Sequence, residues 1–116
     1  MVAARRRAGA GAVASLRPVY YGLHMIRSVK GAATRRFVEA GKSKFPGLDA
    51  DLARRRLATL NAARKLDDLS RLRSVGLHKL AGDRAGFWAI NVNGPWRVVF
   101  RFDAGDAFEV EIVDYH

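Results

Sequence analysis

Seven polar residues of this chain have the side-chain types that metal-free cleavage of RNA requires. Such cleavage needs a base for the 2′-hydroxyl proton, positive charge for the pentavalent phosphate and an acid for the 5′-oxygen. Positioned proton-transfer groups contribute roughly 10²–10⁴-fold, and the electrostatic contribution is comparable. The candidates for proton transfer are His78, Asp114, Tyr115 and His116. The candidates for positive charge are Arg97 at the reaction centre and two RNA-binding residues, Lys79 and Arg84.

Each candidate also has a non-catalytic interpretation. We expect His78 in a loop, where a lone histidine is more often structural than catalytic. Arg84 could pair with Asp83 and stabilise a turn, and Tyr115 could close the edge of the core. From residue types alone, RNA cleavage therefore remains one hypothesis among several.

Other kinds of site find little support in the sequence. The three histidines (His24, His78 and His116) lack the spacing of metal ligands, and the acidic residues are scattered. There is no phosphate-binding glycine loop and no Gly-x-Ser-x-Gly motif. The chain has no cysteine, which excludes disulfides and thiolate metal sites and is consistent with a reducing cytoplasm. The sequence predicts a site without metal or cofactor.

Positive charge is the most unusual feature of the composition. The formal net charge is +10, and the sequence pI is about 11.1. Residues 1–24 contain four arginines and no acid, and we expect them to form a basic, disordered extension. Their apolar stretch is shorter than the roughly 20 residues that span a bilayer. Residues 25–116, the expected folded domain, remain basic on their own, which predicts a polyanionic partner: nucleic acid, anionic lipid or an acidic protein.

The last quarter of the chain predicts an antiparallel meander of three strands. Asn93-Gly94 separates the apolar runs Phe87–Val92 and Pro95–Phe102, which is the strongest short-range hairpin pattern. Residues 103–106 form a second turn, and Phe108–Val113 returns as the third strand. This arrangement brings Arg97 near the C-terminal triplet.

Matching the apolar faces of the last two strands predicts their register. Phe102 would lie opposite Phe108, Phe100 opposite Val110, and Arg101 opposite Glu109. A strand that continues to Tyr115 would place this residue diagonally from Arg97, about 7–8 Å away. We also expect Trp88, Ile90 and Val99 on the Arg97 face. Both faces are then partly apolar, and the pattern does not decide which one the helices cover.

The first half of the domain predicts a strand followed by helices. We expect a strand at Met25–Val29, a helix at Gly31–Ala40 ending at Gly41, and a longer helix from Asp49 or Asp51 to about Lys65. A further helical turn could follow within residues 66–72. The fold class is therefore α+β, with an N-terminal strand and two helices packed on an antiparallel sheet.

Three separated motifs together resemble one known family. They are Leu77-His78-x-Leu80-x-Gly82-Asp83-Arg84-x-Gly86-x-Trp88, then Trp96-Arg97, then Asp114-Tyr115-His116. In residue type and spacing they resemble the HigB toxins of the RelE-like superfamily. The resemblance covers residues 25–116 and implies a RelE-like fold.

The resemblance implies a toxin of a bacterial type II toxin–antitoxin pair that cuts mRNA in the ribosomal A site. It implies a helix-turn-helix antitoxin of the HigA kind as partner, with operator DNA bound only through that antitoxin, and no membrane. By position, the residues that match the family's catalytic residues are His78, Asp114, Tyr115 and His116. Arg97 matches a basic residue near the scissile phosphate.

The chain departs from the family pattern at two positions. Ala81 stands where family members can carry lysine, and Asn93 stands where an arginine is often found. Neutralisation of the phosphate would therefore depend more on Arg84 and Arg97. The alternative function is non-enzymatic: a basic RNA- or ribosome-binding module, or an inactive toxin that serves its antitoxin as co-repressor.

Overall fold

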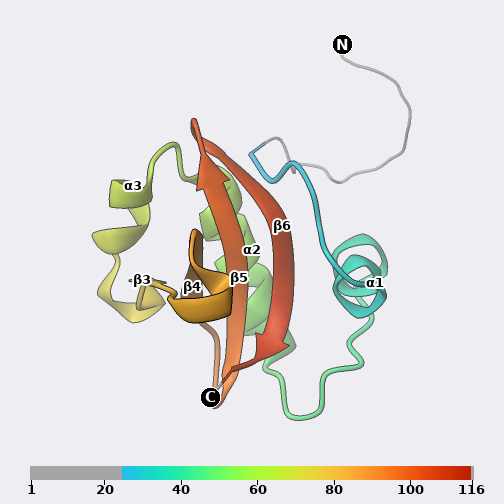
Figure 1. Cartoon of the computed structure of the whole chain (residues 1–116). Coiled ribbons are helices and arrows are strands. Elements are labelled where there is room, and N and C mark those ends of the chain that lie inside the picture. Colours follow the sequence, from blue (N-terminus) through green and yellow to red (C-terminus); the bar gives the residue numbers. More distant parts are fainter. Residues whose placement is uncertain (1–24, 116) are drawn as a thin grey trace, which may run out of the picture.

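The computed structural model describes residues 25–115, so the expectations for residues 1–24 and for His116 lie outside it. Its strands form one antiparallel sheet in the order β3-β4-β5-β6 (Figure 1), and the predicted α+β class is confirmed. The elements in chain order are the helices α1 (Ala32–Ala40), α2 (Ala50–Ala62) and α3 (Leu66–Ser70), the 3₁₀ turn η1 (Arg73–Val75), β3 (His78–Lys79), the 3₁₀ turn η2 (Gly82–Arg84), β4 (Phe87–Asn91), β5 (Trp96–Asp103) and β6 (Asp106–Asp114).

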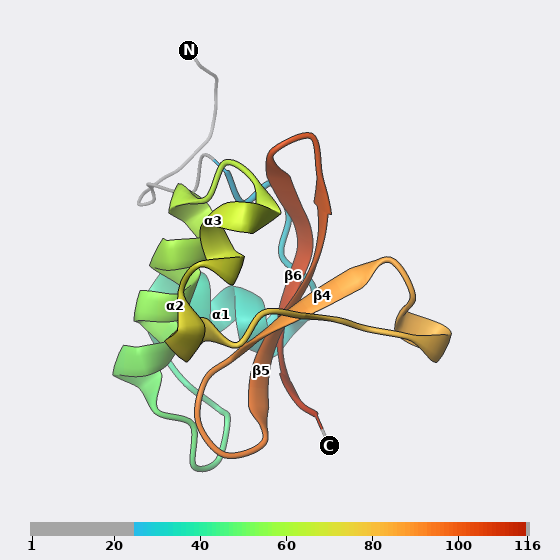
Figure 2. The ribbon, with the colours of Figure 1, turned by 90° about the vertical axis from the view of Figure 1, so that its left-hand side faces the viewer.

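Both predicted helices are present, although α2 ends at Ala62 and not near Lys65 as expected. Gly41 ends α1 in the left-handed conformation, with φ of 71°, and its N–H donates to the carbonyl of Phe37. Asp49 caps α2 by accepting the N–H of Leu52 at 3.0 Å. All three helices lie on one side of the sheet (Figure 2).

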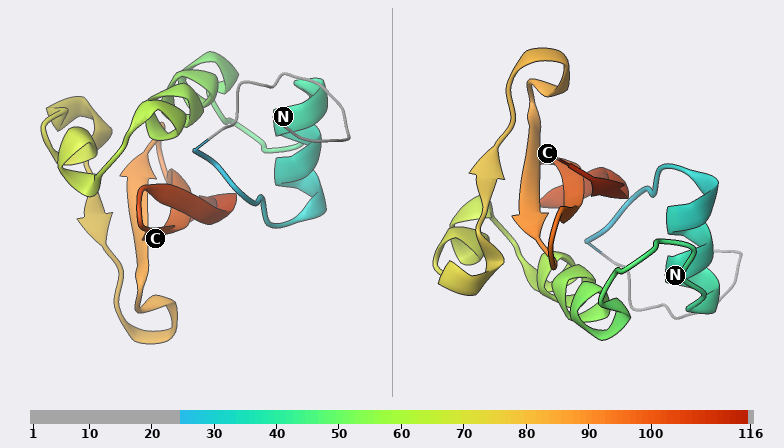
Figure 3. Two further views of the ribbon diagram at one scale, coloured as in Figure 1. Left: turned by 90° about the horizontal axis from the view of Figure 1, so that it is seen from above. Right: turned by 90° about the horizontal axis from the view of Figure 1, so that it is seen from below.

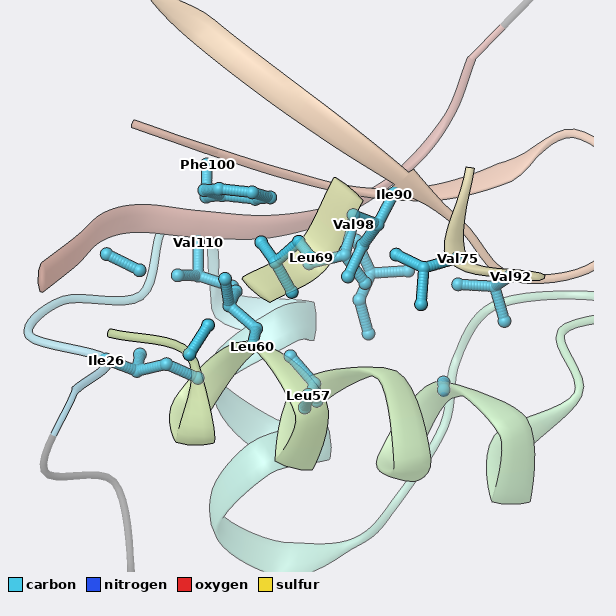
Figure 4. Packing of buried hydrophobic residues seen from close by; sticks show 14 of the residues in the cluster. Ile26, Leu57, Leu60, Leu69, Val75, Ile90, Val92, Val98, Phe100 and Val110 are labelled. Carbon is cyan, nitrogen blue, oxygen red and sulfur yellow. The ribbon is translucent and has the colours of Figure 1, made fainter. Parts of the chain in front are cut away.

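The core lies between these helices and one face of the sheet. On α2, Ala53, Leu57 and Leu60 are buried and form an apolar stripe, which Ala63 at the C-cap extends. Side chains from α2 and α3 meet strand residues such as Ile90, Val98, Phe100 and Val110 there (Figure 4). The helix-covered face is thus the one that carries Val98 and Phe100.

The expected N-terminal strand is reduced to two isolated bridges. Ile26 pairs with Ala107, and Val29 pairs with Val110, both in parallel to β6. The prediction of a continuous strand at Met25–Val29 was therefore wrong. A bulge in β6 lies between the two bridging positions and interrupts the ladder, because a bulge leaves one residue unpaired.

This bulge also corrects the predicted register of β5 and β6. Arg97 pairs with Val113 and Val98 with Ile112, but beyond the bulge Arg101 pairs with Phe108 and Phe102 with Ala107. The expected Phe102–Phe108 pair was therefore wrong. Phe100 faces Glu109 and Val110 together, two residues against one. Glu109 has φ of 53°, and its N–H donates to Ser28 Oγ at 2.8 Å. The expected Arg101–Glu109 pair is not a register pair, yet the two side chains form an ion pair at 3.3 Å.

The β4–β5 hairpin forms as predicted, but its loop is one residue longer than the Asn-Gly pair. The N–H of Val92 donates to the carbonyl of Trp96, which leaves Asn93, Gly94 and Pro95 in the loop. Pro95 has no N–H and cannot complete the tighter turn. The extra residue shifts the register so that Trp88 pairs with Phe100 and Ile90 with Val98. The assignment of Trp88 and Ile90 to the Arg97 face was therefore wrong; they lie on the helix-covered face.

Candidate active site

The sheet face that the helices leave uncovered, which we call the open face, carries three of the seven predicted residues: His78, Arg97 and Tyr115. On β5 this face presents Arg97, Val99 and Arg101, because side chains alternate along a strand. Leu80, Ala89 and Val99 form a small second apolar cluster there, with Phe87 and Val113 packed against it. In the described domain the three helices lie on the other side of the sheet (Figure 2).

His78 lies on the open face, in a strand rather than in the predicted loop. It belongs to β3 and pairs with Ala89, which in turn pairs with Val99. Its ring is half-buried, with Nδ1 at 3.0 Å from the carbonyl oxygen of Gly76. A carbonyl can only accept, so this hydrogen bond requires the proton on Nδ1. In the neutral ring, Nε2 then carries the lone pair and is free to accept a proton.

Arg97 lies two residues along β5 from the His78 row. Its Nη1 donates to the carbonyl oxygens of Gly94 and Trp96, each at 2.8 Å, so the guanidinium folds back toward the β4–β5 loop. Among residues 25–115, only Nη1 of this guanidinium makes a hydrogen bond, so Nε and Nη2 have no partner there. The backbone therefore fixes the guanidinium at one corner while its remaining donors stay available for an anion.

The C-terminal triplet divides between the two faces. Tyr115 follows β6, is exposed, and its N–H donates to the carbonyl of Pro95 at 2.9 Å, beside the loop that holds Arg97. Asp114 pairs with Trp96, so the alternation of side chains directs it toward the helix-covered side. His116 lies outside the described residues.

The two predicted RNA-binding residues are not beside His78 on the open face. Lys79 pairs with Trp88, and its Nζ lies 5.9 Å from the centre of the Trp88 ring. Arg84 belongs to η2 at the tip of the β3–β4 hairpin, which extends away from α2 (Figure 3). Within residues 25–115, Arg84 forms no ion pair with Asp83, so the structure gives no support to the turn-stabilising role.

The open face gathers His78, Arg97 and Tyr115 without bringing them into contact. Strand spacing puts the Cα atoms of His78 and Arg97 about 12 Å apart, two strands across and two residues along. Tyr115 is about 8 Å from Arg97 by the same geometry, on the far side from His78. A ligand must therefore lie across the sheet to touch all three, with Arg97 between the other two.

Two residues that support His78 escaped the sequence reasoning. Gly76 has φ of 63°, and a Cβ at this position would overlap the side-chain amide of Asn91. Asn91 is the last residue of β4 and pairs with Arg97 on β5. The Asn91 side chain therefore lies between Arg97 and the segment that leads to His78. A glycine two residues before a candidate histidine was the available sign, because glycine marks close backbone approach.

The described residues contain neither a candidate metal site nor a candidate membrane span. Within residues 25–115, no group of three or more His, Asp or Glu side chains could hold a metal. None of the helices in that range is long and apolar enough to cross a bilayer.

Comparison with known proteins identifies the family of this chain. The model of a family described as the RelE-like toxin of the type II toxin–antitoxin system HigB matches residues 27–116. Endoribonuclease HigB of Proteus vulgaris is 38% identical over 93 residues, which are 79% of this chain and the whole of that relative. The match spans all the strands and helices described above. The chain belongs to the HigB-like family of RelE-like toxins of type II toxin–antitoxin systems.

Proposed function

We propose that the chain is an endoribonuclease toxin that cuts mRNA on translating ribosomes, without a metal ion. The observation that carries this proposal is the open face of the sheet, where His78, Arg97 and Tyr115 lie in one diagonal row. Membership in a toxin family and the endoribonuclease named among its relatives support the same reaction class.

In the proposed reaction, His78 removes the proton from the 2′-hydroxyl. The Gly76 carbonyl fixes the tautomer whose Nε2 can accept that proton. The 2′-oxygen then attacks phosphorus, and the P–O5′ bond breaks. Arg97 stabilises the charge on the phosphoryl oxygens through the donors that its backbone contacts leave unused.

The acid that protonates the leaving 5′-oxygen comes from the C-terminal triplet. Tyr115 reaches the open face beside Arg97, on the side opposite His78, where a leaving group would lie. His116 completes the triplet in this proposal, whereas Asp114, whose side chain is directed to the helix-covered side, would act by holding the end of the chain in place. Lys79 and Arg84 would contact the nucleotide chain farther from the cut, and Arg84 would do so from the hairpin tip.

The partners follow from this activity. The substrate is mRNA in the ribosomal A site, which places the toxin in the cytoplasm. The basic excess of residues 25–116 suits a ribosomal surface rich in phosphate. A helix-turn-helix antitoxin of the HigA kind neutralises the toxin and alone contacts operator DNA.

Expression without antitoxin tests the proposal. We expect the parent chain to arrest growth and to create new 5′ ends on mRNA from translating ribosomes, as read by primer extension. His78→Ala, Asp114→Ala and His116→Ala should permit growth and leave no new ends. If these variants cut as the parent does, the active site is elsewhere. A parent that binds ribosomes but leaves mRNA intact would instead favour the RNA-binding module or the co-repressor.

A further inference from the structure

A charged side chain in α2 links two segments that flank His78. Arg56 is half-buried, and its Nε donates to the carbonyl oxygen of Asn91 at 2.7 Å. Its Nη2 donates to the carbonyl oxygen of Ser74 at 3.0 Å. One guanidinium thus joins the end of β4 to η1, which precedes β3. Because the two acceptors lie 35 and 18 residues away in sequence, the planar fork fixes long-range geometry.

The two bonded segments carry the contacts that orient the His78 ring. Gly76 follows η1 directly and packs so closely on Asn91 that a Cβ would not fit. Its carbonyl oxygen accepts from His78 Nδ1 at 3.0 Å. A displacement of Ser74 relative to Asn91 would therefore move the Gly76 carbonyl and lengthen the bond that selects the tautomer.

We propose that Arg56 is a positioning residue that fixes the ring orientation and tautomer of His78 through Ser74, Asn91 and Gly76. The inference rests on the proposed function, since it gives His78 a defined state for proton transfer. We assign Arg56 no contact with substrate, because its Nε and Nη2 donate to the backbone carbonyls of Asn91 at the end of β4 and Ser74 in η1. Groups that orient a histidine through its second ring nitrogen typically change activity by 10–100-fold at metal sites, and we expect an effect near the lower figure here.

Nitrogen-15 NMR of the imidazole is the direct test, because it reports the tautomer without any activity. At pH 8, where a free imidazole is neutral, the parent should show His78 with the proton on Nδ1, assigned by the signal lost in His78→Ala. Arg56→Met keeps the aliphatic stem and removes both donors, and it should yield a mixture of tautomers. Arg55→Met, the exposed neighbour on the same helix, is the matched control and should leave the spectrum unchanged.

Cleavage of mRNA by the same variants supplies the functional reading. We expect Arg56→Met to lose about tenfold in rate, in the range seen for orienting groups. Adding Arg56→Met to His78→Ala should cost little more, since both changes act through one imidazole. Arg56→Lys, which keeps the charge but has a single donor nitrogen, should recover part of the rate and of the tautomer; it also serves as the test variant should Arg56→Met fail to fold.

The outcomes separate this inference from the proposed function. An unchanged His78 spectrum in a folded Arg56→Met or Arg56→Lys variant would overturn the positioning role, whatever the cleavage rate. Full cleavage by His78→Ala would overturn the proposed base instead, and with it the catalytic meaning of the tautomer. A loss of rate in Arg56→Met that adds fully to the loss in His78→Ala would also count against a shared path.

Discussion

Asn93 and Asp49 lie 44 residues apart in sequence, and the side-chain oxygen of Asn93 accepts the backbone N–H of Asp49 at 2.7 Å. The Asn93 amide nitrogen donates to the carbonyl of Gly47 at 2.9 Å, so one side chain joins the β4–β5 loop to the segment before α2. The same loop supplies the Gly94 carbonyl that holds Arg97. Asn93 thus anchors the loop that positions Arg97.

Asn93→Ala should therefore weaken both the fold and the proposed site. It removes two hydrogen bonds, each worth about 0.5–1.5 kcal/mol, so we expect the free energy of unfolding in urea to fall by about 1–3 kcal/mol. The rate of mRNA cleavage should fall further than the smaller folded fraction explains, because the loop whose Gly94 carbonyl binds Arg97 is no longer anchored. Trp96→Phe is the comparison: it removes the indole bond to the Pro46 carbonyl and some buried ring volume, but leaves the Asn93 contacts in place. Equal cleavage by the two variants would contradict the link to Arg97.

His78 and Lys79 are adjacent in sequence but present opposite faces of β3, which permits a matched pair of substitutions. His78→Ala should lower ribosome-dependent cleavage by roughly 10²–10⁴-fold, the usual contribution of a general base. Lys79→Ala should cost less than tenfold, because it removes a surface charge over Trp88. Primer extension with equal amounts of each folded variant measures both. A larger loss from Lys79→Ala would place the RNA on the other side of the hairpin.

The limits of the sequence reasoning are clearest in the sheet. The alternation of apolar residues gave the correct pairs from Arg97 to Val99 because one slip would expose a whole face. This alternation could not reveal the bulge at Glu109, because a single non-glycine residue at positive φ does not change the pattern of apolar residues in the sequence. The assignment of Trp88 to the wrong face was avoidable, because Pro95 lacks the N–H that a two-residue loop between β4 and β5 needs.

In the candidate site, too, the sequence pattern predicts residue types, whereas packing decides which contacts they make. The residue types of His78, Arg97 and Tyr115 suggested their chemistry, and the meander brought the last two near each other. The role of Arg56 depends on contacts to two backbone carbonyls, which no side-chain pattern encodes. Its position three residues after Ala53 and four before Leu60, within the buried stripe of α2, was the one available sign.

Arg97 should be sensitive to geometry as well as to charge. Arg97→Gln removes the cation and should lower cleavage by about 10²–10³-fold, the usual cost of losing one donor to a developing oxyanion. Arg97→Lys keeps the charge but loses the fork that reaches Gly94 and Trp96, so it should recover only part of the rate. Arg55→Gln on the exposed face of α2 is the control for net charge. If Arg55→Gln and Arg97→Gln lowered the cleavage rate equally, Arg97 would contribute only through the net charge of the protein.

Asp68, in the α2–α3 region, makes part of the folding stability of the protein depend on pH. The backbone N–H of Arg64 donates to its carboxylate at 2.9 Å, and this hydrogen bond lowers the pKa of Asp68 below its usual value. Because the folded pKa is the lower one, the contribution is present above about pH 4 and is lost as the pH falls through the folded pKa. The difference in melting temperature between the parent and Asp68→Ala should therefore be largest near neutral pH and shrink below pH 4. A difference that grows in acid would contradict this sign.

Residues 25–116 should fold and act as a toxin without residues 1–24. The described domain is anchored from its first residues: Asn61 Oδ1 accepts the N–H groups of Met25 and Ile26, at 3.0 and 3.2 Å. Ile26 is buried and bridges to Ala107. A chain shortened to 25–116 keeps all of these contacts, so we expect its melting temperature and its toxicity in the absence of antitoxin to equal those of the full chain.

A chain shortened further to residues 31–116 loses both bridges to β6 and should melt at a clearly lower temperature. Weaker toxicity of the 25–116 chain at equal stability would instead assign residues 1–24 a role in binding RNA.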